Sequence, residues 1–146
     1  MNRRIPSVLT VMTPFPYAVD EGDSVEDARA MMREHDIHHL PVLKDGKLDG
    51  VVSSRDIDVT LGVLDQQTVA VQLTVGAICT REPYVVEVDA RLDEVAEEIG
   101  RRRIGSALIT KHGKLAGILT IRDVCNAFVA ELRGHPSDND DDDDVA

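Results

Sequence analysis

The sequence predicts an α+β or α/β fold made of two β-α-β-β-α repeats, packed sheet to sheet with pseudo-twofold symmetry. The first observation is an internal repeat, because a shift of 67 residues, from Gly50 to Gly117, aligns the chain with itself without a gap. The second is that the aliphatic runs "GVV" and "GIL" lack polar alternation, so both faces of these strands need cover. The third is size, since a unit of about 55 residues would be marginally stable alone.

The repeat is long and present only twice, which indicates duplication of one small unit rather than a solenoid. Of the 48 positions from 11 to 58, 12 are identical in the second copy, and seven of these lie between Lys44 and Asp56. The expected boundaries divide the chain into four parts: repeat 1 at 8–65, a linker at 66–75, repeat 2 at 76–132 and an acidic disordered tail at 133–146.

The local elements of each repeat follow from its pattern. We expect extended segments at 16–19 ("PYAV") and 83–86 ("PYVV") and an amphipathic helix over 24–35, where Ser24 and Asp27 give a weak capping signal. The inner faces of this helix and its twin are expected to carry Val25, Ala28, Met31 and Met32, and Leu92, Val95, Ala96 and Ile99.

A hairpin and a last helix complete each repeat. Asp45-Gly46 between two aliphatic runs is a strong hairpin signal because both turn positions need positive φ, and His112-Gly113 repeats it less ideally. The last helices are expected at about 54–64 and 121–132.

A hydroxyl and a carboxylate recur where each "G-aliphatic-aliphatic" strand ends, as Ser53-x-x-Asp56 and Thr120-x-x-Asp123. One interpretation is structural, with Ser or Thr capping the next helix and Asp favouring its dipole. The other is a nucleoside-phosphate site, in which the helix start and hydroxyl bind phosphate and the carboxylate accepts from ribose hydroxyls. A single junction of this kind cannot enclose a ligand, so the second interpretation requires both repeats.

The repeated pattern resembles a pair of cystathionine-β-synthase (CBS) domains, also called a Bateman module. The resemblance covers about residues 8–130, and its most specific parts are "IHHLPVL" before an Asp-Gly hairpin and the "G-aliphatic-aliphatic-[ST]-x-x-D" ending. It implies a stand-alone twin with two clefts between the halves and no catalytic residues. Many members bind AMP, ADP, ATP, NAD or S-adenosylmethionine there, with Asp on the ribose and Ser or Thr near the phosphate.

The resemblance also implies which residues line each cleft. The first would take Ser53, Arg55 and Asp56 from repeat 1, with Thr80, Tyr84, Ile104 and Gly105 from repeat 2. The second would take Thr120, Arg122 and Asp123, with Thr13, Tyr17, Ile37 and His38. Leu108 replaces the usual Pro of the first copy, so the two clefts are expected to differ in shape. Arg55 and Arg122 could meet phosphate or lie on the helix surface, and phosphate is favoured because Arg suits bidentate anion contacts.

Other features argue against rival functions. The net charge is −11, and Asp138 and Asp140–Asp144 supply six of these charges, which leaves about −5 for the remainder. A cationic face dominates duplex binding, so nucleic acid is disfavoured as a partner despite the local basic run Arg101–Arg103. His35, His38 and His39 cluster, but neighbouring strand residues point to opposite faces, which favours packing over a metal site. No nucleophile–base motif indicates an enzyme.

The sequence therefore predicts a cytoplasmic regulatory module that binds adenine nucleotides and acts on a partner protein. A signal peptide or membrane span is not expected, and the resemblance implies a homodimer. The alternative is a structural or nucleic-acid-interacting adaptor with empty clefts. The sequence does not indicate which adenosine compound binds, how many sites fill, or which protein responds.

Overall fold

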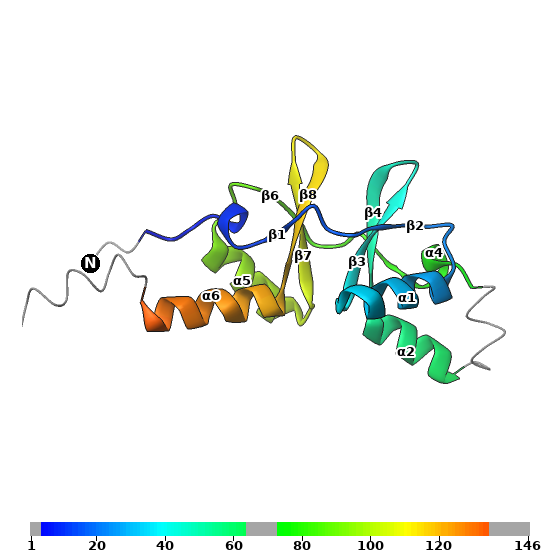
Figure 1. Ribbon diagram of the computed structural model, residues 1–146. Coiled ribbons are helices and arrows are strands. Elements are labelled where there is room, and N and C mark those ends of the chain that lie inside the picture. The colour runs from blue at the N-terminus through cyan, green and yellow to red at the C-terminus, as the bar shows by residue number, and fades with distance from the viewer. Residues whose placement is uncertain (1–3, 64–72, 135–146) are drawn as a thin grey trace, which may run out of the picture.

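The computed structural model describes residues 4–63 and 73–134 (Figure 1). Two halves lie side by side, each with a four-stranded sheet whose hairpin projects on one side and helices on the other (Figure 1). The strands are β1 (Thr13–Pro14), β2 (Val19–Asp20), β3 (His39–Lys44), β4 (Lys47–Ser53), β5 (Thr80–Arg81), β6 (Val85–Glu87), β7 (Ser106–Lys111) and β8 (Lys114–Thr120). The helices are η1 (Val8–Thr10), α1 (Val25–His35), α2 (Ser54–Val63), α4 (Val75–Ile78), α5 (Leu92–Arg102) and α6 (Ile121–Arg133).

Each sheet takes its fourth strand from the other repeat. The first half has the order β2-β3-β4-β5 and the second half has β6-β7-β8-β1. In both, the short home strand is parallel to the first hairpin strand, and the exchanged strand is antiparallel to the second. β4 and β8 also lie against each other, which joins the halves. The predicted α+β fold of two repeats is confirmed.

Most predicted local elements are confirmed. Ser24 caps α1, because its Oγ accepts a hydrogen bond of 3.0 Å from the Asp27 N–H. Both hairpin turns have positive φ at each central residue, 51° and 76° at Asp45-Gly46 and 52° and 78° at His112-Gly113. Such turns match the twist of the flanking strands, so the dipeptide sets the register of β3 against β4 and of β7 against β8.

The segment before each first helix differs from the prediction. Instead of one strand over 16–19, the chain forms β1, a bend at Phe15, an irregular stretch over 16–18 that contains Tyr17, and then β2. Phe15 and its counterpart Glu82 have positive φ, 47° and 54°, which turns the chain between the exchanged and home strands. The short strands β1 and β5 carry too few residues for a periodic signal.

Exchange extends to the two hydrophobic cores. Val8 of η1 is fully buried in the core of the second half, beside Val95, Ile99 and Leu119. Val75 of α4 is fully buried in the core of the first half. Each core therefore contains a segment that precedes the other repeat in the chain, so neither repeat is complete without its partner.

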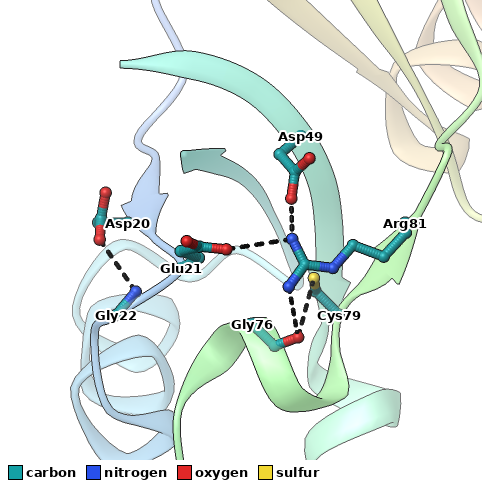
Figure 2. A network of polar contacts seen from close by, with 7 residues as sticks. All are labelled: Asp20, Glu21, Gly22, Asp49, Gly76, Cys79 and Arg81. Atoms are coloured by element: carbon teal, nitrogen blue, oxygen red, sulfur yellow. Dashed lines mark hydrogen bonds and ion pairs between the residues drawn. The ribbon is translucent and has the colours of Figure 1, made fainter. Parts of the chain in front are cut away.

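A charged network fixes the exchanged strand β5 to the first half (Figure 2). The Arg81 guanidinium donates to Asp49 of β4, to Glu21 at 3.2 Å and to the Gly76 carbonyl at 2.9 Å. The Cys79 thiol also points at the Gly76 carbonyl, with 3.8 Å between sulfur and oxygen. The residue that corresponds to Arg81 in β1 is Pro14, so this network has no counterpart in the second half.

The last helices differ in burial. α2 buries Ile57 and Leu61, whereas α6 buries none of its residues. Large apolar side chains on α6 are exposed instead: Ile121, Phe128, Val129 and Leu132. The predicted linker and acidic tail fall mainly on 64–72 and 135–146, outside the described residues. Within the described residues, every helix is too short or too polar to span a bilayer.

Candidate functional site

The larger cavity between the repeats, here called cleft 1, has a volume of about 650 Å³. Its walls are the β4–α2 junction of repeat 1 and, from repeat 2, β5, the loop before β6 and the α5–β7 connection. All seven residues predicted for this cleft line it: Ser53, Arg55, Asp56, Thr80, Tyr84, Ile104 and Gly105. The volume lies within the range of about 300–1,000 Å³ for small-molecule sites. The role of these seven residues in ligand binding stays a prediction.

The corresponding cavity, cleft 2, has a volume of about 280 Å³. Six of its seven predicted residues line it: Thr13, Ile37, His38, Thr120, Arg122 and Asp123. The seventh, Tyr17, is not part of the lining, because its ring stacks on His35 with 3.7 Å between centroids. Cleft 2 is therefore both smaller than cleft 1 and less complete than the sequence predicts.

The repeated hydroxyl–carboxylate motifs do cap helices. In repeat 1 the Ser53 N–H donates to Asp56 Oδ2 at 2.9 Å, and the Asp56 N–H donates to Ser53 Oγ at 3.1 Å. Thr120 and Asp123 make the same reciprocal pair at 2.8 and 3.4 Å. The structural interpretation is thus confirmed at both sites. It is compatible with the nucleoside-phosphate interpretation, because each carboxylate has a second oxygen that can accept a hydrogen bond.

That second oxygen distinguishes the clefts. Asp123 Oδ1 accepts a hydrogen bond of 3.1 Å from the Thr13 hydroxyl, which β1 brings from repeat 1. Asp56 Oδ1 has no such bond within the described residues, and neither has the Thr80 hydroxyl. A ligand hydroxyl in cleft 1 would therefore meet an available carboxylate oxygen, whereas in cleft 2 it would compete with Thr13.

The aligned positions 105 and 38 carry side chains of very different size, a glycine that lines cleft 1 and a histidine that lines both clefts. Gly105 lines cleft 1, and a Cβ at this position would clash with the His39 Nε2 atom. Its counterpart in cleft 2 is His38, whose Nδ1 lies 3.2 Å from the Ser54 hydroxyl. Pro41 and Leu108, which the sequence singled out, line neither cleft. The difference in shape therefore has another origin.

His39 packs between the repeats. Burial lowers the pKa of its imidazole, the neighbouring His38 lowers it further, and the Asp56 carboxylate partly opposes the shift. The neutral form is thus favoured near pH 7, so His39 serves cleft 1 as a packing side chain rather than a charge.

Sequence reasoning missed three charged residues of cleft 1: Glu82, Arg102 and Arg103. The Arg102 guanidinium lies 4.6 Å from the Tyr84 ring centroid and donates to Glu98 at 2.6 Å. Hydrogen bonds from Arg101 and then Arg102 lower the pKa of Glu98 to about 2. The available signal was the run "RRR" at 101–103, which aligns with "EHD" at 34–36 in the other repeat.

A third hollow of about 410 Å³ lies within repeat 1 alone, between α1 and α2. It shares His38 and Ser54 with cleft 1, and Arg29, Arg33, Asp36 and Asp58 give it balanced charges. The three clustered histidines do not converge on a metal position, because within residues 4–63 and 73–134 no group of three or more metal-ligating side chains comes together.

Comparisons with known proteins identify the repeated domain. The model of the CBS domain matches residues 8–60 and 75–130. The chain belongs to the CBS domain family. Because two separate segments match, it contains a tandem CBS pair, and the clefts described above lie between the two domains.

Curated relatives include both small proteins and large enzymes. The chain is 32% identical over 104 residues to the uncharacterized protein YlbB of Bacillus subtilis, covering 70% of this chain and 68% of that one. It is 30% identical over 110 residues to hypoxic response protein 1 of Mycobacterium tuberculosis, covering 73% of each. Inosine-5′-monophosphate dehydrogenase of Korarchaeum cryptofilum is 34% identical over 107 residues, or 73% of this chain. The chain spans only 21% of that enzyme's length.

Solved structures of CBS pairs share the fold. CBSX2 in complex with AMP is 28% identical, with a TM-score of 0.72 and coverage of 88% of this chain and 98% of that one. The CBS pair of protein MJ0100, in complex with 5′-methylthioadenosine and S-adenosyl-L-methionine, has a TM-score of 0.77 at 24% identity. It covers 88% of this chain and 99% of its own, and at that identity it supports the fold alone.

Proposed function

We propose that this CBS pair is a regulatory module that binds an adenosine-containing ligand between its repeats. AMP, ADP and ATP are the first candidates, and NAD and S-adenosylmethionine are the others. The observation that carries the proposal is cleft 1, where side chains from both repeats converge on one cavity of about 650 Å³. The AMP complex of the relative CBSX2 supports the choice of ligand class.

The lining of cleft 1 offers a contact for each part of such a ligand. Asp56 Oδ1 can accept from ribose hydroxyls, and Ile104 supplies an apolar wall for a flat base. Arg55 and the hydroxyl of Ser53 stand at the start of α2, where a helix terminus favours phosphate. Hydrogen bonds to charged groups contribute about 1.5–3 kcal/mol each, so a few of them give useful affinity.

Ligand binding would act as a signal because the site spans both repeats. Occupancy stabilises the paired form by about 2.7 kcal/mol at one hundred times the dissociation constant. A partner protein would respond to the resulting change in shape or assembly. The exposed apolar side chains of α6, among them Phe128 and Leu132, support a homodimer as the form in which the module acts.

The module acts by binding rather than by chemistry. Asp56 and Asp123, the carboxylates of the repeated motif, serve as helix caps. The enzymes among the relatives are matched over only 21–24% of their length. The alternative is an adaptor with empty clefts that contacts protein or nucleic acid, which the run Arg101–Arg103 alone would favour.

Isothermal titration with AMP, ATP, NAD and S-adenosylmethionine, each at physiological salt, tests the proposal. Micromolar binding of at least one compound is expected, and Asp56→Ala should weaken it at least about tenfold. Asp123→Ala is the matched control, because it removes the same type of helix cap but leaves cleft 1 intact. If none of the four compounds binds, the sensor function is wrong, and a salt-sensitive gel shift with DNA or RNA would favour the adaptor.

A further inference from the structure

Two arginines from different repeats line cleft 1 without partners of their own. Arg55 lies in the first turn of α2, and Arg103 is the C-cap of α5. Neither guanidinium has a hydrogen bond or ion pair within residues 4–63 and 73–134. Two like charges that line one cavity raise its positive potential, and an anion that enters relieves their repulsion.

Cleft 2 carries the opposite charge at one of these two positions. Arg122 corresponds to Arg55, but Asp36 stands where cleft 1 has Arg103. Arg122 Nη1 lies 4.0 Å from Asp36 Oδ2. The pair is exposed, so its effect is on the local charge of the cleft more than on stability.

The backbone at this position is the same in both repeats. Asp36 and Arg103 each end a helix in the left-handed conformation, with φ of 50° and 56°. Only the side chain differs, and the difference reverses a charge. Around it, cleft 1 carries three arginines against the carboxylates of Asp56 and Glu82. Cleft 2 carries one arginine against two carboxylates.

We propose that cleft 1 selects adenosine compounds with a multiply charged anionic tail, through Arg55 and Arg103, and that Asp36 excludes such compounds from cleft 2. This selectivity rests on the proposed function and adds to it the class of ligand and the number bound. Guanidinium groups bind phosphate oxygens in a planar, bidentate manner, so each added phosphate can engage a further donor in cleft 1. The same phosphates would approach the Asp36 carboxylate in cleft 2.

A charge series of ligands tests the selectivity on the full chain. Adenosine, AMP, ADP and ATP are titrated at one salt concentration, and affinity is expected to rise along the series with one ATP bound per chain. Arg103→Asp copies the residue that the chain itself uses at the end of α1, so the helix ending is retained. It should lower ATP affinity at least about tenfold and change adenosine affinity less than about twofold.

The reciprocal variant tests the exclusion. Asp36→Arg should raise the stoichiometry from one ATP per chain to two, because it places arginines in cleft 2 at the same two positions as Arg55 and Arg103 in cleft 1. Added salt should weaken ATP binding more than adenosine binding, since screening acts on the charged tail. Thermal unfolding of both variants checks that the fold is kept.

The outcomes separate the two proposals. A wild-type chain that binds adenosine and ATP equally, or an Arg103→Asp variant that keeps the preference for ATP, overturns the selectivity and leaves the binding function standing. Two equal ATP sites in the wild type also overturn it. If none of adenosine, AMP, ADP and ATP binds, the selectivity fails, and the proposed function fails with it only when NAD and S-adenosylmethionine do not bind either.

Discussion

Clefts 1 and 2 are formed by corresponding segments of the two repeats but differ in volume and in the side-chain atoms that are available to a ligand. Cleft 1 is more than twice as large, and the Asp56 oxygen that faces away from the cap has no partner within the described residues. In cleft 2 the same oxygen of Asp123 is held by Thr13, and Arg122 lies near Asp36. Duplication thus preserved the caps and the backbone, while the lining residues diverged. A duplicated module can therefore tune two sites separately without changing its fold.

The exchanged strands β1 and β5 also differ, in how each is held to its sheet. β5 is tied to the first half by the Arg81 network, whereas β1 has Pro14 at that position (Figure 2). Both strands approach the hairpin at a glycine, Gly50 for β5 and Gly117 for β1. Each junction can therefore be weakened separately by substitution.

Alanine at the two glycines should give the largest difference between the junctions. A Cβ at Gly50 would lie 2.6 Å from the backbone oxygen of Thr80, so β5 itself must move. A Cβ at Gly117 would meet the flexible Met12 side chain and would also lie 2.9 Å from the backbone oxygen of Thr13, so β1 must move as well, but by less. We expect Gly50→Ala to lower the free energy of unfolding by about 3 kcal/mol and Gly117→Ala by about 1 kcal/mol. Urea denaturation measures both, and equal losses would contradict the comparison.

Removal of the Arg81 guanidinium should loosen β5 with a smaller effect. Arg81→Met keeps the aliphatic stem but leaves Asp49, Glu21 and the Gly76 carbonyl without this donor. The network is partly exposed, so we expect a loss of about 1.5 kcal/mol in urea denaturation, reduced by added salt. Arg91→Met is the control and should change stability little, because Arg91 is exposed and its partner among the described residues is Asp93, two positions away. A similar loss in both variants would show that the Arg81 network stabilises the chain no more than the surface ion pair of Arg91 and Asp93.

The parts of this architecture that the sequence predicted are those with a local cause. The Asp45-Gly46 turn requires positive φ, and the Ser24 cap satisfies an N–H of α1, so both could be read from residue types. Exchange of β1 and β5 could not, because two-residue strands carry no period and their partners lie far along the chain. The resemblance to CBS pairs nevertheless implied that each cleft draws on both copies.

The candidate site was predicted where a motif recurs and missed where the copies differ. Ser53, Asp56 and their counterparts stand out because they are alike in both repeats. Arg103 was missed because the sequence does not show that its side chain lines cleft 1. Its charge becomes informative only by comparison with Asp36, the aligned residue that lines cleft 2. Tyr17 was predicted in the lining of cleft 2, whereas the structure stacks its ring on His35 outside that lining.

The Thr13 hydroxyl should matter to cleft 2 in a way that Thr80 does not matter to cleft 1. Thr13→Val removes the hydrogen bond to Asp123 Oδ1 with little change of shape, and we expect it to lower the free energy of unfolding by about 1 kcal/mol. Thr80→Val is the matched control and should cost less than about 0.3 kcal/mol, because no described residue bonds its hydroxyl. Equal losses in urea denaturation would mean that Asp123 is as available as Asp56.

The smallest effect should come from the pH dependence of His39, which has Ser106 as its counterpart and therefore acts in one half only. Burial against Gly105 holds the pKa of folded His39 below the value of about 6.5 in the unfolded chain. As the pH falls below 6.5, the unfolded chain takes up this proton first, so the free energy of unfolding decreases. The decrease ends once the folded form is also protonated, and Asp56 limits its size. Urea denaturation between pH 7.5 and 5.5 should show a shallower slope for His39→Gln than for the wild type. Parallel slopes would mean that the pKa of His39 is the same in the folded and the unfolded chain.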